Sequence, residues 1–374
     1  MIALLTISYW QINAFVAFLL SAIFAGVLIP KILLIAFRRK LFDEPDERKI
    51  HHSTVPRLGG IAFEPVIIFC VFFLLMVDLL SGQDLLLNEF SKNVIEISSG
   101  ICGLILLYLI GIADDLIGVK YRAKFAIQIV CGLLFVMAGL YVSDFHGLLF
   151  LHNLPAWFAI PLSVILIVFI INAMNLIDGI DGLASGLSGV ALFYYGLFFF
   201  TIEQYAYSII AFSTLGTVVP FFYYNVFGIA EKQKKIFMGD TGSLTIGIIL
   251  CLLSIKLANS SVENCTNYNP IAIGFAPLLI PCMDVVRVFL HRLKNGKSPF
   301  LPDQSHIHHK FLKVGMNQRA AMLTIIGISI FCTILVALGS EFINVNILFI
   351  FVIAAYTVGN CWLSKKIKEK DSEW

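Results

Sequence analysis

Long apolar tracts separated by short polar breaks run along almost the whole chain of 374 residues. Many of these tracts approach or exceed the roughly 20 apolar residues that cross a bilayer as an α-helix. Read between the polar breaks, they predict spans at 10–37, 60–80, 95–113, 123–142, 157–175, 183–201, 206–226, 242–257, 271–289, 321–339 and 345–363. We therefore expect an all-α, polytopic membrane bundle of about eleven transmembrane helices.

Composition strengthens this interpretation. The chain is 59% hydrophobic and 13% charged, whereas soluble domains are roughly half apolar and about a quarter charged. No polar stretch is long enough to build a soluble core, so we expect residues 1–374 to form a single integral-membrane domain. The eight cysteines are scattered and form no CxxC pair, which excludes the usual zinc and redox motifs.

Positive charge is segregated along the chain. Consecutive spans alternate in direction, and every Lys and Arg except Lys92 and Lys256 falls on one side of the expected membrane. That side carries the loops at about 38–58, 114–124, 172–182, 227–243 and 291–320 and the tail after 364. By the positive-inside rule it is cytoplasmic, which predicts an N-terminus outside the cell and a cytoplasmic C-terminus.

Two acidic motifs lie at the expected cytoplasmic helix ends. Asp114 and Asp115 end one span, and adjacent carboxylates beside hydrocarbon repel each other unless a cation intervenes. They either form a helix end neutralised by the basic residues that follow or contribute a Mg²⁺ or general-base site. The motif FMGDTGS contains Gly239 and Asp240 and leads into another span. Asp240 could cap that helix, or the glycines and free N–H groups there could receive a phosphate.

A third acidic motif combines carboxylates and amides. Asn172, Asn175, Asp178 and Asp181 recur every three residues, so on a helix each would neighbour the next. Their loop contains no Lys or Arg, which leaves the acids without a local ion-pair partner. Such oxygen ligands suit Mg²⁺, although capping and turn residues around the glycines of this motif are the structural alternative.

Two basic loops accompany these acids. The loop 291–320 contains Arg292 and three histidines, His306, His308 and His309. Three histidines raise the possibility of zinc, but no cysteine lies near and the loop is positive, so phosphate recognition fits better. The loop 38–58 contains Lys49 and His51 and is either an anchor for anionic lipids or a loop that approaches a ligand.

Acids and amides suited to Mg²⁺ thus alternate with basic loops suited to phosphate at one membrane face. Phosphoryl transfer needs this combination, because its catalysis depends on positioning and on neutralising spread negative charge. A soluble nucleotide could enter from the cytosol and a lipid phosphate from the bilayer. A transporter is the main alternative, but it would place polar residues near the bilayer midplane.

Four segments carry a resemblance to a known family: DDLIGVKYRAK, NAMNLIDGIDGLASG, FMGDTGS and SPFLPDQSHIHHKF. In this order and spacing they resemble the polyprenyl-phosphate N-acetylhexosamine-1-phosphate transferases, also called glycosyl transferase family 4. Within the family the pattern is similar to the undecaprenyl-phosphate GlcNAc-1-phosphate transferases. The phospho-MurNAc-pentapeptide transferases of peptidoglycan synthesis, the alternative branch, usually show three successive histidines where this chain has Ile307.

The resemblance implies transfer of GlcNAc-1-phosphate from UDP-GlcNAc to undecaprenyl phosphate, with release of UMP. This is the initiating membrane step of O-antigen and other lipopolysaccharide, enterobacterial common antigen or teichoic acid synthesis. It implies Mg²⁺ as cofactor, with Mn²⁺ as an alternative, and a bacterial inner-membrane enzyme whose active site faces the cytoplasm. The expected partners are the two substrates and the bilayer, with a homodimer left open and no nucleic acid.

The resemblance also assigns roles. Asp240 and Asn175 would bind the metal, and Asp114 or Asp115 would position or deprotonate the lipid phosphate. Asp178 and Asp181 would hold the nucleotide or assist the metal. The histidines would meet the diphosphate and the sugar, with His308 and His309 counted as catalytic. The remaining expected substrate-binding residues are Lys49, His51, Lys124, Asn172, Gly239, Arg292 and His306.

Overall fold

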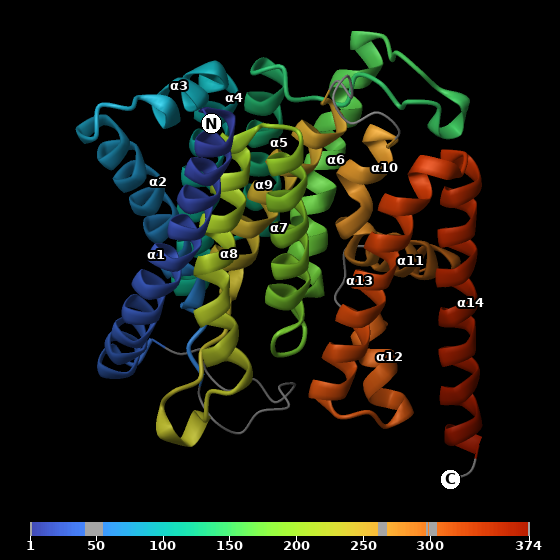
Figure 1. The fold of residues 1–374 in the computed structure, drawn as a ribbon. Helices are drawn as coiled ribbons and strands as arrows, with labels where there is room; N and C mark the ends of the chain where they lie inside the picture. The colour runs from blue at the N-terminus through green and yellow to red at the C-terminus, as the bar shows by residue number, and fades with distance from the viewer. Residues whose placement is uncertain (1, 42–54, 261–267, 297, 299–304, 373–374) are drawn as a thin grey trace.

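The computed structural model describes residues 2–41, 55–260, 268–296, 298 and 305–372, and within these ranges every regular element is helical. The fourteen α-helices form an upright bundle (Figure 1). They are α1 (Ile2–Arg39), α2 (Phe63–Leu80), α3 (Leu85–Lys92), α4 (Val94–Ile117), α5 (Tyr121–Met137), α6 (Ala156–Ile177), α7 (Leu183–Thr201), α8 (Tyr205–Val226), α9 (Gly239–Ala258), α10 (Pro270–Phe275), α11 (Leu279–Lys294), α12 (Ile307–Val314), α13 (Gln318–Phe342) and α14 (Val345–Ser372). The predicted all-α membrane bundle is confirmed.

Among the described residues, ten helical segments are long and apolar enough to cross a membrane. They correspond to ten of the eleven predicted spans. The remaining prediction, 123–142, corresponds to α5, which is only 17 residues long and packs against α4 and α6. The start of α1 and the end of α14 lie at opposite ends of the bundle (Figure 1), which needs an odd number of crossings and therefore counts the shorter α5 together with the ten long segments.

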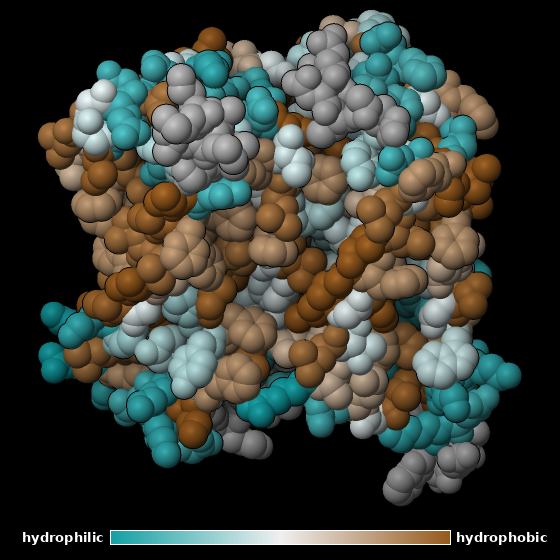
Figure 2. All heavy atoms as spheres, in the orientation of Figure 1, coloured by the Kyte–Doolittle hydropathy of each residue, from teal (hydrophilic) through white to brown (hydrophobic). Residues whose placement is uncertain are grey.

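The burial of the helices follows from their place in the bundle. In α9, 94% of the apolar window is buried, against 28% in α1 and 22% in α14. The exposed side chains of the outer helices are largely apolar, and Figure 2 shows a brown band of such side chains between polar ends. This band is the surface that a membrane protein presents to lipid, so the chain is a multi-pass membrane protein.

The predicted span 271–289 is interrupted. The structure divides it into α10, a short 3₁₀ turn at Ala276–Leu278 and α11, and Figure 1 shows α11 turning sideways from the direction of α10. Pro277 lies in the turn and Pro281 in the first turn of α11. Because proline lacks the N–H that a continuous helix needs, the interruption follows from these two residues.

Candidate active site

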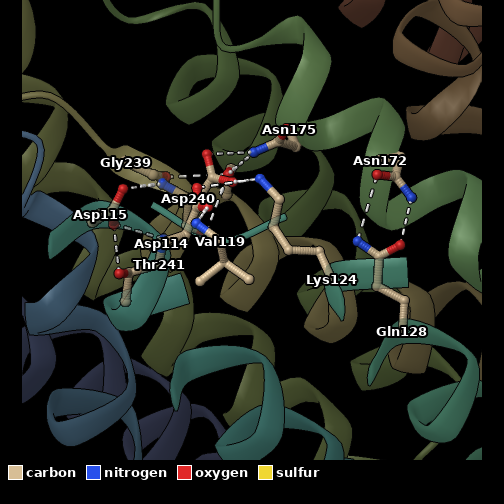
Figure 3. Close-up of polar contacts among 11 residues, drawn as sticks. Asp114, Asp115, Val119, Lys124, Gln128, Asn172, Asn175, Gly239, Asp240 and Thr241 are labelled. Atoms are coloured by element: carbon tan, nitrogen blue, oxygen red, sulfur yellow. Dashed lines mark hydrogen bonds and ion pairs between the residues drawn. The ribbon is translucent and has the colours of Figure 1, made fainter. Parts of the chain in front are cut away.

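Four helix ends meet at one end of the bundle and bring three of the predicted polar loops together. The C-terminal ends of α4 and α6 lie against the N-terminal ends of α5 and α9 (Figure 3). α4 contributes Asp114 and Asp115, α5 contributes Lys124, α6 contributes Asn175 and α9 contributes Asp240. Residues more than a hundred positions apart in the sequence therefore form one cluster.

Asp240 lies at the centre of this cluster. One of its carboxylate oxygens accepts a 2.6 Å bond from the Lys124 ammonium, and the other accepts a 3.1 Å bond from the Asn175 amide. The same amide donates to Ser243 Oγ at 2.8 Å, one helical turn further along α9. Asp240 and Asn175, the two residues expected to bind a metal, are therefore direct neighbours.

Asp115 is held by the first turn of α9. Its two oxygens accept bonds from the backbone N–H of Asp240 at 2.8 Å and of Thr241 at 2.9 Å, and from the Thr241 hydroxyl at 2.6 Å. The expectation that free N–H groups at this helix start would receive a phosphate is wrong for these two groups, because a neighbouring carboxylate already caps them. Asp115 instead fixes the backbone position from which the Asp240 side chain projects.

Glycines allow this close approach of chain segments. A side chain on Gly111 of α4 would overlap the backbone of Thr241. Gly239 has a φ of +73°, and a side chain there would collide with the carbonyl of Arg57 and the carboxylate of Asp115. The close backbone approach expected at Gly239 is thus made by other segments of the protein. Its role in binding substrate stays a prediction. A backbone bond of 3.0 Å from Gly59 N–H to the carbonyl of residue 237 ties the loop containing Arg57 to the same place.

Asp114 completes the cluster from the other side of Lys124. It accepts a 2.7 Å bond from the backbone N–H of Val119, and its second oxygen lies 3.2 Å from the Lys124 ammonium. Two carboxylates, Asp114 and Asp240, therefore share one ammonium, and Asp115 is held beside them by backbone and hydroxyl donors. The cluster carries an excess of negative charge that favours binding of a further cation.

Asp178 and Asp181 lie in the turn after α6, because the helix ends at Ile177. The expected continuous helical ladder from residue 172 to 181 is therefore wrong beyond this point. Burial raises the pKa of Asp178 to about 7, with further contributions from Asp181 and Asp240 and an opposing one from Arg57. Asp178 is thus electrostatically linked to the Asp240 cluster.

Two of the predicted acid and amide groups have partners from outside their own loop. Asp181 forms a 2.6 Å ion pair with Lys235. Asn172 donates a 2.6 Å bond to the Gln128 side chain, and Figure 3 shows this pair apart from Asp240. The absence of Lys and Arg from residues 172–182 therefore does not leave Asp181 unpaired. The expected substrate-binding amide of Asn172 is already occupied by a helix-to-helix contact.

The three histidines lie at the start of α12, across from the turn that contains Asp178. The rings of His306 and His308 stack with centroids 5.8 Å apart, and those of His308 and His309 are tilted at 4.2 Å. A side chain on Gly179 would overlap the ring of His308. The histidine segment thus contacts the acidic turn directly.

His308 has an unusual environment within this segment. It is 1% exposed, and neither ring nitrogen has a hydrogen-bond partner among the described residues. Burial and the neighbouring His309 and His306 lower its pKa to about 3, so the ring is neutral at physiological pH. Buried polar groups without partners are rare and costly, which makes these nitrogens candidate contacts for a bound substrate.

The remaining predicted residues stand as follows. Arg292 is largely buried in the last turn of α11, whereas Lys49 and His51 lie outside the described residues. Among the described residues, no three His, Cys, Asp or Glu side chains are grouped as metal ligands would be, so the histidines are not arranged as a zinc site. Sequence reasoning did not single out Arg57, Lys235 or Thr241, although each lies beside a motif that it did identify.

The fold and site together define a polytopic membrane protein with a carboxylate- and histidine-lined polar site at one end of its bundle. A family model described as glycosyl transferase family 4 matches residues 97–258. A Bacillus subtilis (strain 168) relative named "Probable undecaprenyl-phosphate N-acetylglucosaminyl 1-phosphate transferase" is 30% identical over 349 residues, which are 92% of this chain and 90% of the relative.

Two further relatives carry the name undecaprenyl-phosphate alpha-N-acetylglucosaminyl 1-phosphate transferase. The protein from Escherichia coli (strain K12) is 28% identical over 96% of this chain and 91% of its own. The protein from Yersinia pestis is 28% identical over 78% of this chain and 74% of its own. The chain therefore belongs to glycosyl transferase family 4, as its motifs predicted, and is a membrane-bound sugar-phosphate transferase.

Proposed function

We propose that the protein transfers GlcNAc-1-phosphate from UDP-GlcNAc to undecaprenyl phosphate, giving undecaprenyl-diphospho-GlcNAc and UMP. The observation that carries the proposal is the convergence of Asp114, Asp115, Asn175 and Asp240 with the histidine-bearing α12 at one end of the bundle. Such a place is open to a water-soluble donor and to a lipid acceptor. The names of the curated relatives support the lipid acceptor and the transferred GlcNAc-1-phosphate.

The cluster offers oxygen donors to a divalent cation, although no three His, Cys, Asp or Glu side chains of the described residues are grouped as ligands. The carboxylates of Asp240 and Asp114 and the amide of Asn175 are the hard oxygen donors that Mg²⁺ and Mn²⁺ prefer. Two of these acids, Asp114 and Asp240, also share a single ammonium, that of Lys124. We assign Mg²⁺, or Mn²⁺ in its place, to Asp240 and Asn175 with Asp114 beside them. The bound ion would neutralise part of the charge on the donor diphosphate.

The proposed reaction is direct attack by the lipid phosphate. An oxygen of undecaprenyl phosphate forms a bond to the β-phosphorus of UDP-GlcNAc, and the bond from that phosphorus to the bridging oxygen breaks. The bridging oxygen leaves with UMP. A phosphate monoester is already largely anionic near neutral pH, with a second pKa of about 6, so the attacking group needs no strong base.

The chain's own residues position this reaction. Asp115 fixes the start of α9 and hence the Asp240 side chain. Asp178 has a pKa of about 7, so its carboxyl can accept or release a proton at physiological pH. The neutral His308 ring, with two nitrogens free among the described residues, can accept and donate hydrogen bonds to the diphosphate or sugar.

The orientation in the membrane follows from charge. Lys124, Lys235 and Arg57 lie at the same end of the bundle as the site, and nearly all other Lys and Arg residues belong to loops of this side. By the positive-inside rule we therefore propose that the site faces the cytoplasm, and the bacterial origin of the relatives supports an inner membrane as its location. This is the face at which UDP-sugars are available.

Two alternatives remain for comparison. A phospho-MurNAc-pentapeptide transferase is disfavoured by Ile307, which interrupts the histidines, and by the curated relatives' names. A nucleotide-sugar transporter is disfavoured because the acid cluster lies at helix ends rather than at mid-helix. A transporter would also need no paired carboxylates at a phosphate-binding site.

The test uses the full-length purified protein in lipid nanodiscs. UDP-GlcNAc, UDP-GalNAc and UDP-MurNAc-pentapeptide are offered in turn with undecaprenyl phosphate, and UMP release and the lipid product are measured. We expect UMP release with UDP-GlcNAc only when the lipid is present, complete loss on chelation with EDTA, and recovery on adding Mg²⁺ or Mn²⁺.

Other outcomes would contradict specific parts of the proposal. Preferential use of UDP-MurNAc-pentapeptide would overturn the sugar assignment. Activity that survives EDTA would overturn the metal assignment. Uptake of intact UDP-GlcNAc into proteoliposomes without UMP formation would favour the transporter.

A further inference from the structure

A second buried carboxylate lies outside the cluster around Asp240. Asp284 is in the middle of α11, its side chain is 0% exposed, and no motif of the sequence contains it. A buried carboxylate is costly unless it is paired and hydrogen-bonded. Its partners therefore indicate what it does.

Asp284 receives four donors from three helices and a loop. One oxygen accepts a 2.8 Å bond from His306 Nδ1. The other accepts bonds from the Ile307 backbone N–H at 3.0 Å, from Arg287 at 2.8 Å and from the Tyr356 hydroxyl at 3.1 Å. Arg287 also donates to the carbonyl of Ser305 at 2.5 Å. The carboxylate thus joins α11 and α14 to the start of α12.

The bond to His306 fixes that ring. With a carboxylate as acceptor, Nδ1 must carry a proton, so Nε2 of the neutral ring is the acceptor nitrogen. His306 in turn stacks on His308, whose ring tilts against His309. The orientation of one ring therefore affects the two others.

A second set of contacts holds the far side of α12 against α14. The Lys310 ammonium donates to Ser364 Oγ at 2.9 Å and to the Asn360 amide oxygen at 3.3 Å. These bonds do not involve Asp284, so α12 keeps an attachment to α14 when Asp284 is altered. Loss of Asp284 should accordingly change the orientation of the histidines more than it changes the fold.

We propose that Asp284 is a positioning residue for donor recognition: it sets the tautomer of His306 and, through that ring, the orientation of the three histidines assigned to the UDP-sugar. This inference rests on the proposed function, because it assigns the histidines to the donor. It adds a residue of α11, which no motif of the sequence contains, to the determinants of donor binding.

The test compares Asp284→Asn with His306→Ala and the double variant in nanodiscs, where each substrate is varied in turn while the other is saturating. An amide at position 284 can present its NH₂ to Nδ1 and reverse the tautomer of His306. We expect Asp284→Asn to raise KM for UDP-GlcNAc about 10-fold, the effect of losing one charge-assisted hydrogen bond. KM for undecaprenyl phosphate should change by less than about 2-fold, which corresponds to less free energy than the loss of one such hydrogen bond.

The double variant separates positioning from a merely structural role. If Asp284 acts through His306, the double variant is no worse than His306→Ala alone. Tyr356→Phe is the matched control, since it removes one of the four donors and leaves the His306 bond in place. It should raise KM for UDP-GlcNAc by less than about 2-fold, because a neutral donor contributes less than a charged one.

An activity-independent readout completes the test. Hydrogen exchange over residues 305–314 should increase in Asp284→Asn and stay unchanged in Tyr356→Phe, while protection of α9 stays the same in both. Additive losses in the double variant, or equal changes in both KM values, would overturn the positioning role. Absence of UMP release from the unaltered protein would instead overturn the proposed function, and the exchange data would still report on Asp284.

Discussion

The helix pair α4 and α9 is joined by charged groups at both of its ends, and the two junctions differ in charge balance. At the end of the helix pair away from the candidate active site, which we call the outer end, Glu96 of α4 forms a 2.6 Å ion pair with Lys256 of α9. The Tyr207 hydroxyl also donates to Glu96, and Asn93 accepts a 3.2 Å bond from Lys256. One carboxylate meets one ammonium, and both have further neutral partners.

At the inner end, close to the candidate active site, two carboxylates share one ammonium and a third carboxylate, that of Asp115, lies beside them. Lys124 bridges Asp114 and Asp240 at 3.2 and 2.6 Å, while Asp115 is held by backbone and hydroxyl donors. Balanced charge serves to join two helices, whereas excess charge costs stability unless a ligand supplies the missing cation. The comparison therefore identifies the outer junction as structural and the inner junction as the functional one.

The largest expected effect comes from removing one carboxylate of the inner junction. Asp240→Asn should lower turnover by about 100- to 1000-fold, the scale of losing a main electrostatic contact in a transition state. The protein should still fold, because an amide can retain contact with Lys124 and Asn175. UMP release per milligram of monodisperse protein, judged by size-exclusion chromatography, is the measurement.

The matched control for that change lies at the outer junction. Glu96→Gln makes the same acid-to-amide replacement on the same helix pair. Turnover per folded molecule should stay within about 2-fold of the unaltered protein, a free-energy change below that of one hydrogen bond. Near-normal turnover in Asp240→Asn, or equal losses in both variants, would remove the functional difference between the two junctions.

The two junctions also show how far the sequence predicts this molecule. The spans and the acidic motifs were predictable, because a bilayer demands long apolar helices and a polar group beside hydrocarbon is conspicuous. The pairing of Lys124 with Asp240 was not, because it joins residues 116 positions apart. It depends on α4 and α9 packing closely at Gly111, which local patterns do not specify.

Two site residues were not identified from the sequence, although an acid within an apolar tract, such as Asp284, is itself a signal. Asp284 lies in an apolar tract and belongs to no motif, so only the position of α12 against α11 reveals its partners. Lys235 belongs to a basic run that resembles a solvated loop, yet it pairs with Asp181. In both cases the missing information is the tertiary contact itself, and local propensity contains none of it.

The excess acid at the inner end should also make stability depend on pH. Burial, with Asp181 and Asp240, raises the pKa of Asp178 to about 7, whereas an unfolded aspartate has a pKa of about 3.9. Between these values the folded protein binds more protons than the unfolded chain, so stability falls as pH rises and levels off above about 7. Thermal midpoints at pH 5, 6, 7 and 8 in detergent would measure this slope.

Asp178→Asn should reduce that slope, raising the midpoint at pH 8 by on the order of 5 °C relative to the unaltered protein. Asp84→Asn, at an exposed position beyond the outer end of α2, is the control and should leave the slope unchanged. A slope that is identical in Asp178→Asn and the unaltered protein would show that the excess charge is relieved by groups other than Asp178.

The smallest expected effect is the stability contribution of the outer junction. Glu96→Gln removes the ion pair to Lys256, but the Lys256 ammonium keeps its bond to Asn93 and its position 5.0 Å from the centre of the Tyr207 ring. Both side chains of the pair are only partly buried, so we expect a loss of about 1 kcal/mol. In a chain of this size that corresponds to a fall of about 2 °C in the thermal midpoint.

Lys256→Met sharpens this last comparison, because it leaves the Glu96 carboxylate without its cation instead of leaving the cation without its acid. Tyr207 still donates to Glu96, but an unpaired carboxylate beside hydrocarbon is costlier than an ammonium with an amide and a ring for partners. We therefore expect a larger fall than in Glu96→Gln. Equal falls would mean that the junction depends on packing between the helices, and that charge balance at the outer end contributes little.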